Sequence, residues 1–164
     1  MTETRKINLG LSSGRLLQFF RDGEPHTKAE LANLTGLARS TVSLRLDPLL
    51  ALGVICPMTD ATSTGGRPSA RLQLKEDAFV VGAVSFGATH AQASLADLSG
   101  KILVSMDTKR QISDGPEVCL RWMTSELKYL LAGLGIQEDR LLVIGIGVPG
   151  PVEHTTGRPA NPPI

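Results

Sequence analysis

A cluster of hydroxyl and guanidinium side chains stands in the first half of the 164-residue chain. Arginine can bond guanine bidentately, and serine and threonine hydroxyls can reach phosphates or base edges. Apolar residues at helical spacing (Val42, Leu46, Leu49 and Leu50) separate the polar ones, so that the polar side chains point away from the apolar face of one helix. The cluster predicts a contact with DNA. Its members are Arg39, Ser40, Thr41 and Ser43, which are expected to face the major groove, and Arg45, which is expected nearer the phosphates.

A second candidate contact lies in the polar stretch of residues 59–68, which contains Gly65, Gly66 and Arg67. Glycines let a backbone approach phosphates closely, and an arginine on a narrow hairpin tip fits a minor groove. We expect this stretch to be the tip of a wing. Two alternatives stay open: Arg67 pairs with a carboxylate such as Asp60 and steadies the hairpin, or the whole unit binds protein, with Arg39 and Arg45 as solvated surface.

Three helices are expected to carry these groups. The first spans residues 12–21, with Ser12 or Ser13 as its cap. The second spans residues 28–35 and buries Leu31, Ala32 and Leu34. Thr27 and Glu30 match a capping box at its start, and Thr27 is a further candidate DNA contact.

A tight turn at Gly36 leads to the third helix, residues 39–52, which Gly53 ends. Two short helices joined by a tight turn are typical of a helix-turn-helix. Pro48 lies inside the third helix and is expected to kink or break it beyond the DNA-facing turns. Strands at residues 54–56 and 71–74 then flank the wing.

The second half reads as an α/β domain. Strands are expected at residues 79–86, 90–98 and 101–107, then a helix to about residue 131 and a buried strand at 141–148. Asp114 is the expected cap of the helix and Pro116 its first residue. The helix is expected to bury a set of apolar residues: Val118, Leu120 or Trp122, Leu127 and Leu130.

Composition agrees with a DNA-binding module joined to another domain. Residues 1–75 hold ten basic and six acidic side chains, a net charge of +4, and the remainder holds seven and ten, a net charge of −3. No apolar run could cross a bilayer and the N-terminus shows no secretion signal, so we expect a cytoplasmic protein without membrane contact. Cys56 and Cys119 stand singly and predict two buried free thiols, with no metal site and no cofactor.

Several runs together resemble the ROK family (repressor, open reading frame, kinase). In the first half they are residues 35–43 (TGLARSTVS), 52–55 (LGVI) and 64–68 (TGGRP). In the second half they are residues 81–89, 95–100 and 145–152. The likeness is to the transcriptional-repressor branch, in which a winged helix precedes a sugar-kinase-like domain.

The resemblance implies an α+β winged helix-turn-helix in residues 1–76. Residues 77–164 would then be an incomplete α/β actin-like lobe, since family members continue into zinc-binding and sugar-binding parts that this chain lacks. It also implies a sugar-responsive repressor that binds double-stranded operator DNA as a homodimer, with a sugar or sugar derivative as effector.

Catalysis is not expected. Kinases of the family carry Asp-x-Gly-x-Thr at the first hairpin, and the matching stretch here holds Ser85, Gly87 and Thr89, a degenerate phosphate loop. A hydroxyl is a poor magnesium ligand beside a carboxylate, and a tight turn is the preferred explanation of Gly87. The alternatives to a repressor are a sugar kinase with an N-terminal extension and a DNA-binding fragment without a ligand response.

Overall fold

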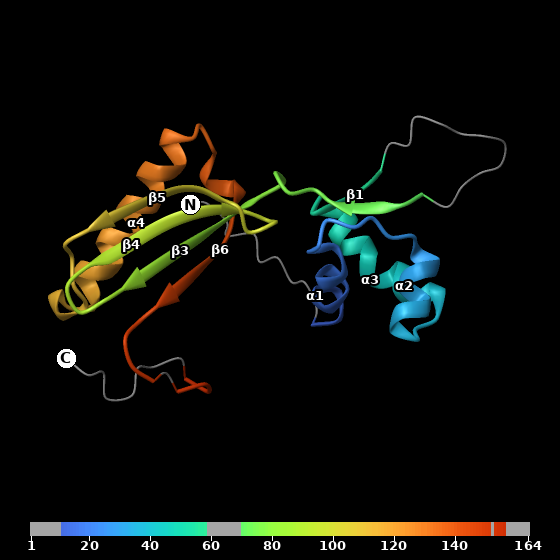
Figure 1. Ribbon diagram of the computed structural model, residues 1–164, viewed down its shortest axis with the longest axis horizontal. Helices are drawn as coiled ribbons and strands as arrows, with labels where there is room; N and C mark the ends of the chain where they lie inside the picture. Colours follow the sequence, from blue (N-terminus) through green and yellow to red (C-terminus); the bar gives the residue numbers. More distant parts are fainter. Residues whose placement is uncertain (1–10, 59–69, 152, 157–164) are drawn as a thin grey trace, which may run out of the picture. The chain divides into compact units, whose positions relative to one another are not determined.

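The computed structural model describes residues 11–58, 70–151 and 153–156 (Figure 1). Contacts between residues divide the chain into two compact units, residues 1–78 and 79–164. The first unit is mainly helical, and its elements are α1 (Leu11–Leu17), η1 (Gln18–Phe20), α2 (Lys28–Thr35), α3 (Arg39–Ala51), β1 (Ile55–Pro57) and β2 (Leu72–Leu74). Each expected helix and strand of this unit is present, with its ends shifted by a few residues at most.

The core of the first unit forms where the apolar faces of its helices meet the short β1–β2 sheet. Helical spacing places these residues on one side of each helix, which lets them pack together away from water. The expectation that Leu34 is buried is wrong, because Leu31 and Ala32 occupy the inner face of α2 and leave Leu34 59% exposed. The buried members are Leu16, Phe20, Leu31, Ala32, Val42, Leu46, Leu49, Ile55 and Leu72.

The ends of α2 follow the sequence signals. The hydroxyl of Thr27 accepts a hydrogen bond from the Glu30 backbone N–H at 3.1 Å, and the Glu30 carboxylate accepts one from the Thr27 N–H at 2.7 Å. Gly36 ends the helix with φ of 69°, a conformation that favours glycine. The expected cap of the first helix is wrong, because α1 begins at Leu11 and both Ser12 and Ser13 lie inside it.

Pro48 does not break α3, which continues to Ala51. A proline removes one backbone donor, and the remaining turn is held by other bonds. The Leu52 N–H donates to the Pro48 carbonyl, and the Val54 N–H donates to the Leu49 carbonyl, both at 3.0 Å. The helix that carries the candidate DNA contacts is therefore continuous.

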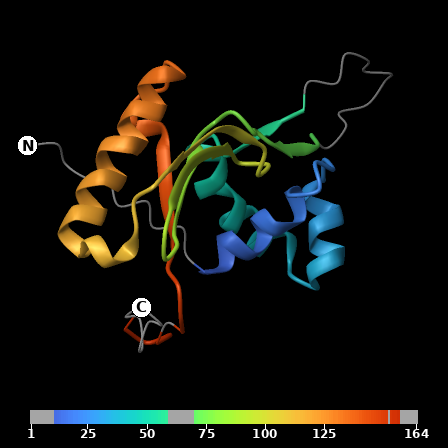
Figure 2. The same cartoon turned by 60° about the vertical axis from the view of Figure 1, so that its left-hand side comes forward.

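The second unit is a mixed four-stranded sheet with one long helix on one face, as Figure 2 shows from the side. The strand order is β5-β4-β3-β6, with β3, β4 and β5 antiparallel and β6 parallel to β3. The order of strands and helix agrees with the α/β expectation. The elements are β3 (Val80–Phe86), β4 (Ala91–Asp97), β5 (Ile102–Thr108), η2 (Ile112–Asp114), α4 (Pro116–Gly133), η3 (Glu138–Arg140) and β6 (Leu141–Gly147).

The buried face of α4 differs from the expectation in the N-terminal half of the helix and agrees with it in the C-terminal half. Val118 and Leu120 are exposed, and Trp122 is half-buried against Phe86 with ring centroids 5.7 Å apart. Leu127 and Leu130 are buried as expected. The buried face of α4 consists of Cys119, Met123, Leu127, Leu130 and Leu131.

Pro116 begins α4 as expected, but Asp114 is not its cap. The residue before Pro116 is Gly115, whose φ of 89° favours glycine, and the Asp114 carboxylate accepts from the Gln111 N–H at 3.4 Å. This bond closes the short turn η2 instead of the start of α4. Of the two thiols, Cys119 is buried but Cys56 is only half-buried.

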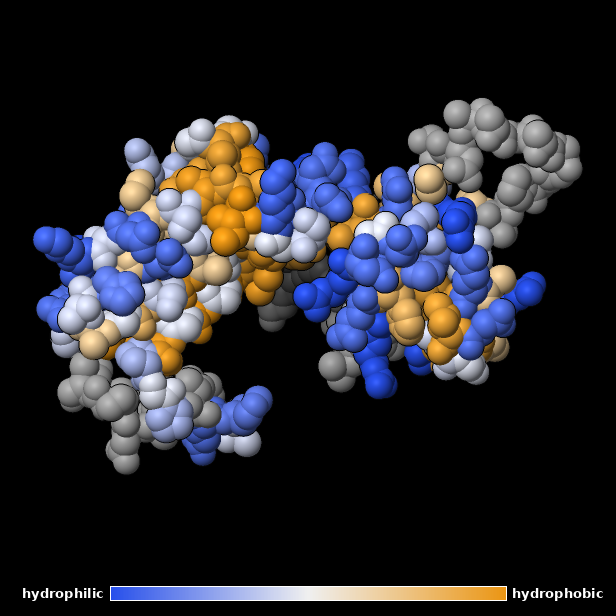
Figure 3. All heavy atoms as spheres, in the orientation of Figure 1, coloured by the Kyte–Doolittle hydropathy of each residue, from blue (hydrophilic) through white to orange (hydrophobic). Residues whose placement is uncertain are grey.

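The expectation of a buried last strand is wrong. β6 lies at the edge of the sheet, and most of its residues are exposed, including Val143 and Ile146. Figure 3, which shows one face of the molecule, has hydrophobic side chains at the surface of both units. None of the helices in the described ranges is long and apolar enough to cross a membrane.

Candidate nucleic-acid interface

The exposed side of α3 is fixed by the residues on its opposite side. Val42, Leu46 and Leu49 are fully buried in the core shared with α1 and α2. At 3.6 residues per turn, the residues between them must point outward or to the flanks. The short turn of residues 36–38 between α2 and α3 holds the two helices together, which fixes how α3 is presented.

The structure brings the candidate contacts of α3 to this outer side in two groups. Arg39 and Ser40 are exposed in the first turn. Thr41, Ser43 and Arg45 are half-buried and lie along the flanks. The N-terminal end of α3 therefore presents a guanidinium group and hydroxyls to solvent, as the sequence predicts.

Two basic side chains among the described residues of the first unit have an acidic partner. Lys28 Nζ lies 4.0 Å from the Asp47 carboxylate, and Arg71 lies 3.1 Å from Glu30. Within the part of the chain that the structure describes, Arg15, Arg39 and Arg45 form no ion pair. Their charges are therefore available for a phosphate backbone.

Arg45 also shares a hollow with a basic residue that the sequence did not single out. A hollow of about 360 Å³ between α1 and α3 is lined by Arg15, Thr35 and Arg45, among others. The Thr35 hydroxyl already donates to the Leu31 carbonyl at 2.6 Å, so the groups of this hollow that could bind an anion such as phosphate are the two guanidinium groups.

Thr27 is already engaged at the start of α2. Its hydroxyl accepts from the Glu30 N–H, and Glu30 also bonds Arg71 of the segment that leads into β2. The pKa of Glu30 lies below its ordinary value of 4.5, chiefly because its carboxylate accepts a hydrogen bond from the Thr27 backbone N–H. Burial raises this pKa, whereas the Thr27 hydroxyl and Arg71 lower it further. The three side chains tie the N-terminus of α2 to the base of the expected wing.

Glu30→Gln is expected to destabilise the first unit at neutral pH but not in acid. Because the folded state lowers the pKa of Glu30, its ionised form contributes stability above 4.5, and this contribution is lost as the pH falls through the lowered value. The difference in urea midpoint between the wild type and Glu30→Gln should therefore shrink as the pH falls below 4.5. A difference that stays constant down to acid pH would show that the charge of Glu30 has no part in the cap.

The base of the expected wing is attached to the segment before α2. β1 and β2 pair antiparallel, with Ile55 opposite Leu74. His26 exchanges two backbone hydrogen bonds with Leu72, at 2.9 and 2.8 Å, and its ring nitrogen Nε2 lies 2.9 Å from the Phe19 carbonyl oxygen. The tip, with Gly65, Gly66 and Arg67, lies outside the described residues, so its DNA contact stays a prediction.

In the expected degenerate phosphate loop, Gly87 and Thr89 both contact His90, whereas Ser85 lines a hollow on the sheet. The Gly87 N–H donates to the His90 carbonyl at 2.7 Å, and a side chain on Gly87 would meet that carbonyl at 3.1 Å. Thr89 Oγ1 lies 3.4 Å from His90 Nδ1 in the same turn. Ser85 lies instead on the exposed side of β3. The tight turn therefore accounts for Gly87.

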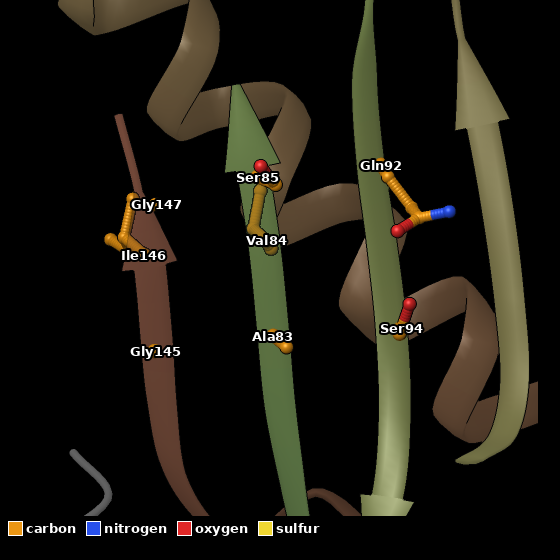
Figure 4. A pocket seen from close by; sticks show the side chains of 8 residues that line it. All are labelled: Ala83, Val84, Ser85, Gln92, Ser94, Gly145, Ile146 and Gly147. Atoms are coloured by element: carbon orange, nitrogen blue, oxygen red, sulfur yellow. The ribbon is translucent and has the colours of Figure 1, made fainter. Parts of the chain in front are cut away.

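Ser85 lines a hollow of about 380 Å³ on the sheet face opposite α4 (Figure 4). Small residues on β3 and β6 leave this space, and Gln92 and Ser94 of β4 border it. None of its lining side chains carries a charge. The hollow offers hydroxyl and amide groups but no carboxylate that could hold a magnesium ion. Its lining residues are Ala83, Val84, Ser85, Gln92, Ser94, Gly145, Ile146 and Gly147.

Besides Arg15, sequence reasoning missed two further features of the candidate interface. Leu44 is 73% exposed on the outer side of α3, although a leucine in an amphipathic helix is ordinarily assigned to the core. Its spacing of one turn from Ser40 was the signal that could have found it. The sequence predicts only a strand at Arg71. Its ion pair with Glu30 could not be predicted from a local pattern, because the two residues are 41 positions apart in the chain.

Comparisons with known proteins connect the chain to regulators of transcription. It is 30% identical to the uncharacterized protein y4fQ of Sinorhizobium fredii over 142 residues, which are 87% of this chain and 36% of that protein. It is 27% identical to the xylose repressor of Bacillus subtilis over 153 residues, 93% of this chain and 38% of the repressor. No protein-family model matches the chain.

The fold has a counterpart among solved structures. The crystal structure of a ROK family transcriptional regulator, a homolog of the E. coli MLC protein, superposes with a TM-score of 0.69 at 19% identity. The superposition covers 93% of this chain and 38% of that one. The chain therefore spans somewhat more than a third of the length of the proteins it matches.

Proposed function

We propose that this chain, a relative of the ROK-family transcriptional regulators, binds operator DNA through α3 and represses transcription in response to a sugar. The resemblance to that family, expected from the sequence, is confirmed by relatives named as repressors. The observation that carries the proposal is the outer side of α3, where Arg39 and Ser40 are exposed and no ion pair among the described residues neutralises Arg39 or Arg45.

In this proposal the first unit is a winged helix-turn-helix. α2 and α3 are its two helices, α3 enters the major groove, and β1 and β2 are the base of the wing. Arg67, with Gly65 and Gly66, would then reach an adjacent minor groove. A pair of half-sites bound by two copies of the chain would supply the affinity that a single helix lacks.

The effector is proposed on the names of the relatives. The protein of Bacillus subtilis is named a xylose repressor, and this chain matches 38% of it. We assign the sugar class to the whole regulator and not to any residue described above. Phosphoryl transfer is not part of the proposal, because Ser85 stands where a kinase of the family has its aspartate and the adjoining hollow has no carboxylate in its lining.

Selection from a random pool of DNA duplexes tests the function. The chain should enrich a common sequence and bind it at least about a thousandfold more tightly than a scrambled duplex at physiological salt. Equal affinity for every duplex would contradict the proposal. Xylose, the sugar in the names of the repressor relatives, should then weaken binding when it is added.

Arg45→Gln should reduce the salt dependence of binding by about one unit of the logarithmic slope, since one phosphate contact is lost. The physical basis is the hollow that Arg45 shares with Arg15. Arg121→Gln on α4 is the matched control, because Arg121 is exposed in the second unit and should leave the slope unchanged. Identical slopes for the wild type and Arg45→Gln would remove Arg45 from the interface.

A further inference from the structure

We propose that Leu44 reads a thymine in the operator by packing against its 5-methyl group in the major groove. The inference rests on the proposed function and extends it from the polar contacts of α3 to an apolar one. Leu44 is 73% exposed, the highest value among the exposed large hydrophobic side chains of the described residues. Its own helix buries Val42, Leu46 and Leu49.

The position of Leu44 on α3 is that of a base contact. It follows Ser40 by four residues, which places the two side chains one above the other on the same side of the helix. Ser40 is exposed in the first turn, and the N-terminal turns of a recognition helix are those that contact base edges. A side chain one turn further along the same side faces the next bases.

The chemistry of Leu44 fits one base in particular. Each base pair presents a distinct set of groups in the major groove, and thymine alone presents a methyl group. An apolar side chain has no hydrogen bond to offer the other base edges, so it would leave their donors or acceptors without a partner. Contact with thymine removes apolar surface from water on both sides.

The charges around Leu44 agree with a DNA-facing position. Arg39 and Arg45 lie on the same helix and form no ion pair among the described residues. Asp47, the nearby carboxylate on α3, is 4.0 Å from Lys28 Nζ, which offsets its charge.

Leu34, the other strongly exposed leucine of this unit, has the opposite setting. It lines a hollow together with Asp22, Glu24 and the ion pair of Glu30 with Arg71. The carboxylates of Asp22 and Glu24, which form no ion pair among the described residues, would repel phosphates. Exposure alone therefore does not single out Leu44; its place beside the basic and hydroxyl groups of α3 does.

The test replaces single thymines by deoxyuridine, which removes only the 5-methyl group, in the duplex that the full chain selects. For the wild type, uracil at one thymine of a single half-site should weaken binding about fourfold, the effect of one methyl group. For Leu44→Ala the same replacement should have no effect, while Leu34→Ala should behave as the wild type. Thermal unfolding of both variants should match the wild type, because both side chains are exposed.

Three results would overturn the proposal. The first is that uracil leaves wild-type binding unchanged at every thymine. The second is that uracil weakens the binding of the wild type and of Leu44→Ala equally, which would indicate a response to DNA shape. Leu44→Ala could leave DNA binding intact and reduce self-association in sedimentation experiments, which would assign Leu44 to a contact between two copies of the chain. If the wild type selects no sequence at all, the proposed function fails first; if it selects a sequence but ignores the methyl groups, only the role of Leu44 fails.

Discussion

Leu46→Ala is expected to lower the free energy of unfolding of the first unit by about 2–5 kcal/mol. Leu46 is fully buried in the core that joins α3 to α1 and α2. Its truncation removes apolar contacts and leaves a cavity that the neighbouring side chains fill only in part. Because domains are stable by only about 5–15 kcal/mol, a loss of this size would leave much of the unit unfolded at mild denaturant concentrations.

The measurement must separate the two units. Trp122 and Tyr129 are the only tryptophan and tyrosine and both lie on α4, so fluorescence of Trp122 reports on the second unit. Hydrogen exchange of the α3 amides, followed by mass spectrometry, reports on the first unit. We expect exchange in α3 to accelerate in Leu46→Ala while the urea transition of Trp122 fluorescence stays in place.

Leu44→Ala is the matched control for Leu46→Ala. It makes the same chemical change two residues away on the same helix, but at an exposed site, where the loss should stay within about 0.5 kcal/mol. If the α3 amides are equally protected from hydrogen exchange in both variants, Leu46 does not contribute the packing energy that its burial implies.

The contrast between these two leucines also shows how far the sequence predicts the fold. Local signals located the helices of the first unit: the capping box at Thr27 and Glu30, the glycine stop at Gly36 and the apolar period of α3 each act within a few residues. They did not predict the start of α1 or the exposure of Leu34. Position on a helix was harder to predict where apolar residues occur on several sides. In α4, Val118 and Leu120 compete with Cys119 and Met123 for the buried face, and only the packing against the sheet decides.

The candidate site likewise contains features that local sequence patterns predict and features that they do not. The exposure of Arg39 and Ser40 could be predicted because polar groups between apolar residues of a helix ordinarily face solvent or a ligand, whereas Thr41, Ser43 and Arg45 are only half-exposed. Leu44 was missed because its residue type argues for the core, although its spacing of one turn from Ser40 pointed to the outer side. The bond between Arg71 and Glu30 joins parts of the chain 41 residues apart, so it depends on tertiary structure and not on a pattern in the sequence.

Arg39→Ala is expected to weaken binding to the selected operator by about 1–3 kcal/mol, roughly 5- to 150-fold, and to relax the preference at one base pair. Arg39 is the first residue of α3, is exposed, and forms no ion pair within the described residues. Its guanidinium group can donate two parallel hydrogen bonds to the O6 and N7 atoms of guanine, which no other base edge accepts in the same way. Since the side chain is exposed, its removal should not change the stability of the fold.

The comparison with Arg39→Lys decides between a base contact and a phosphate contact. Lysine keeps the charge but loses the planar pair of donors, so it would preserve an attraction to phosphate and lose most of the discrimination for guanine. The measurement is the affinity for the operator and for duplexes that carry each of the other base pairs at the affected position. Arg39→Lys should lose nearly as much specificity as Arg39→Ala but less overall affinity. If Arg39→Ala weakens every duplex equally and Arg39→Lys restores binding, Arg39 contacts only the phosphate backbone, and the reading of sequence by α3 depends on its hydroxyl groups and on Leu44.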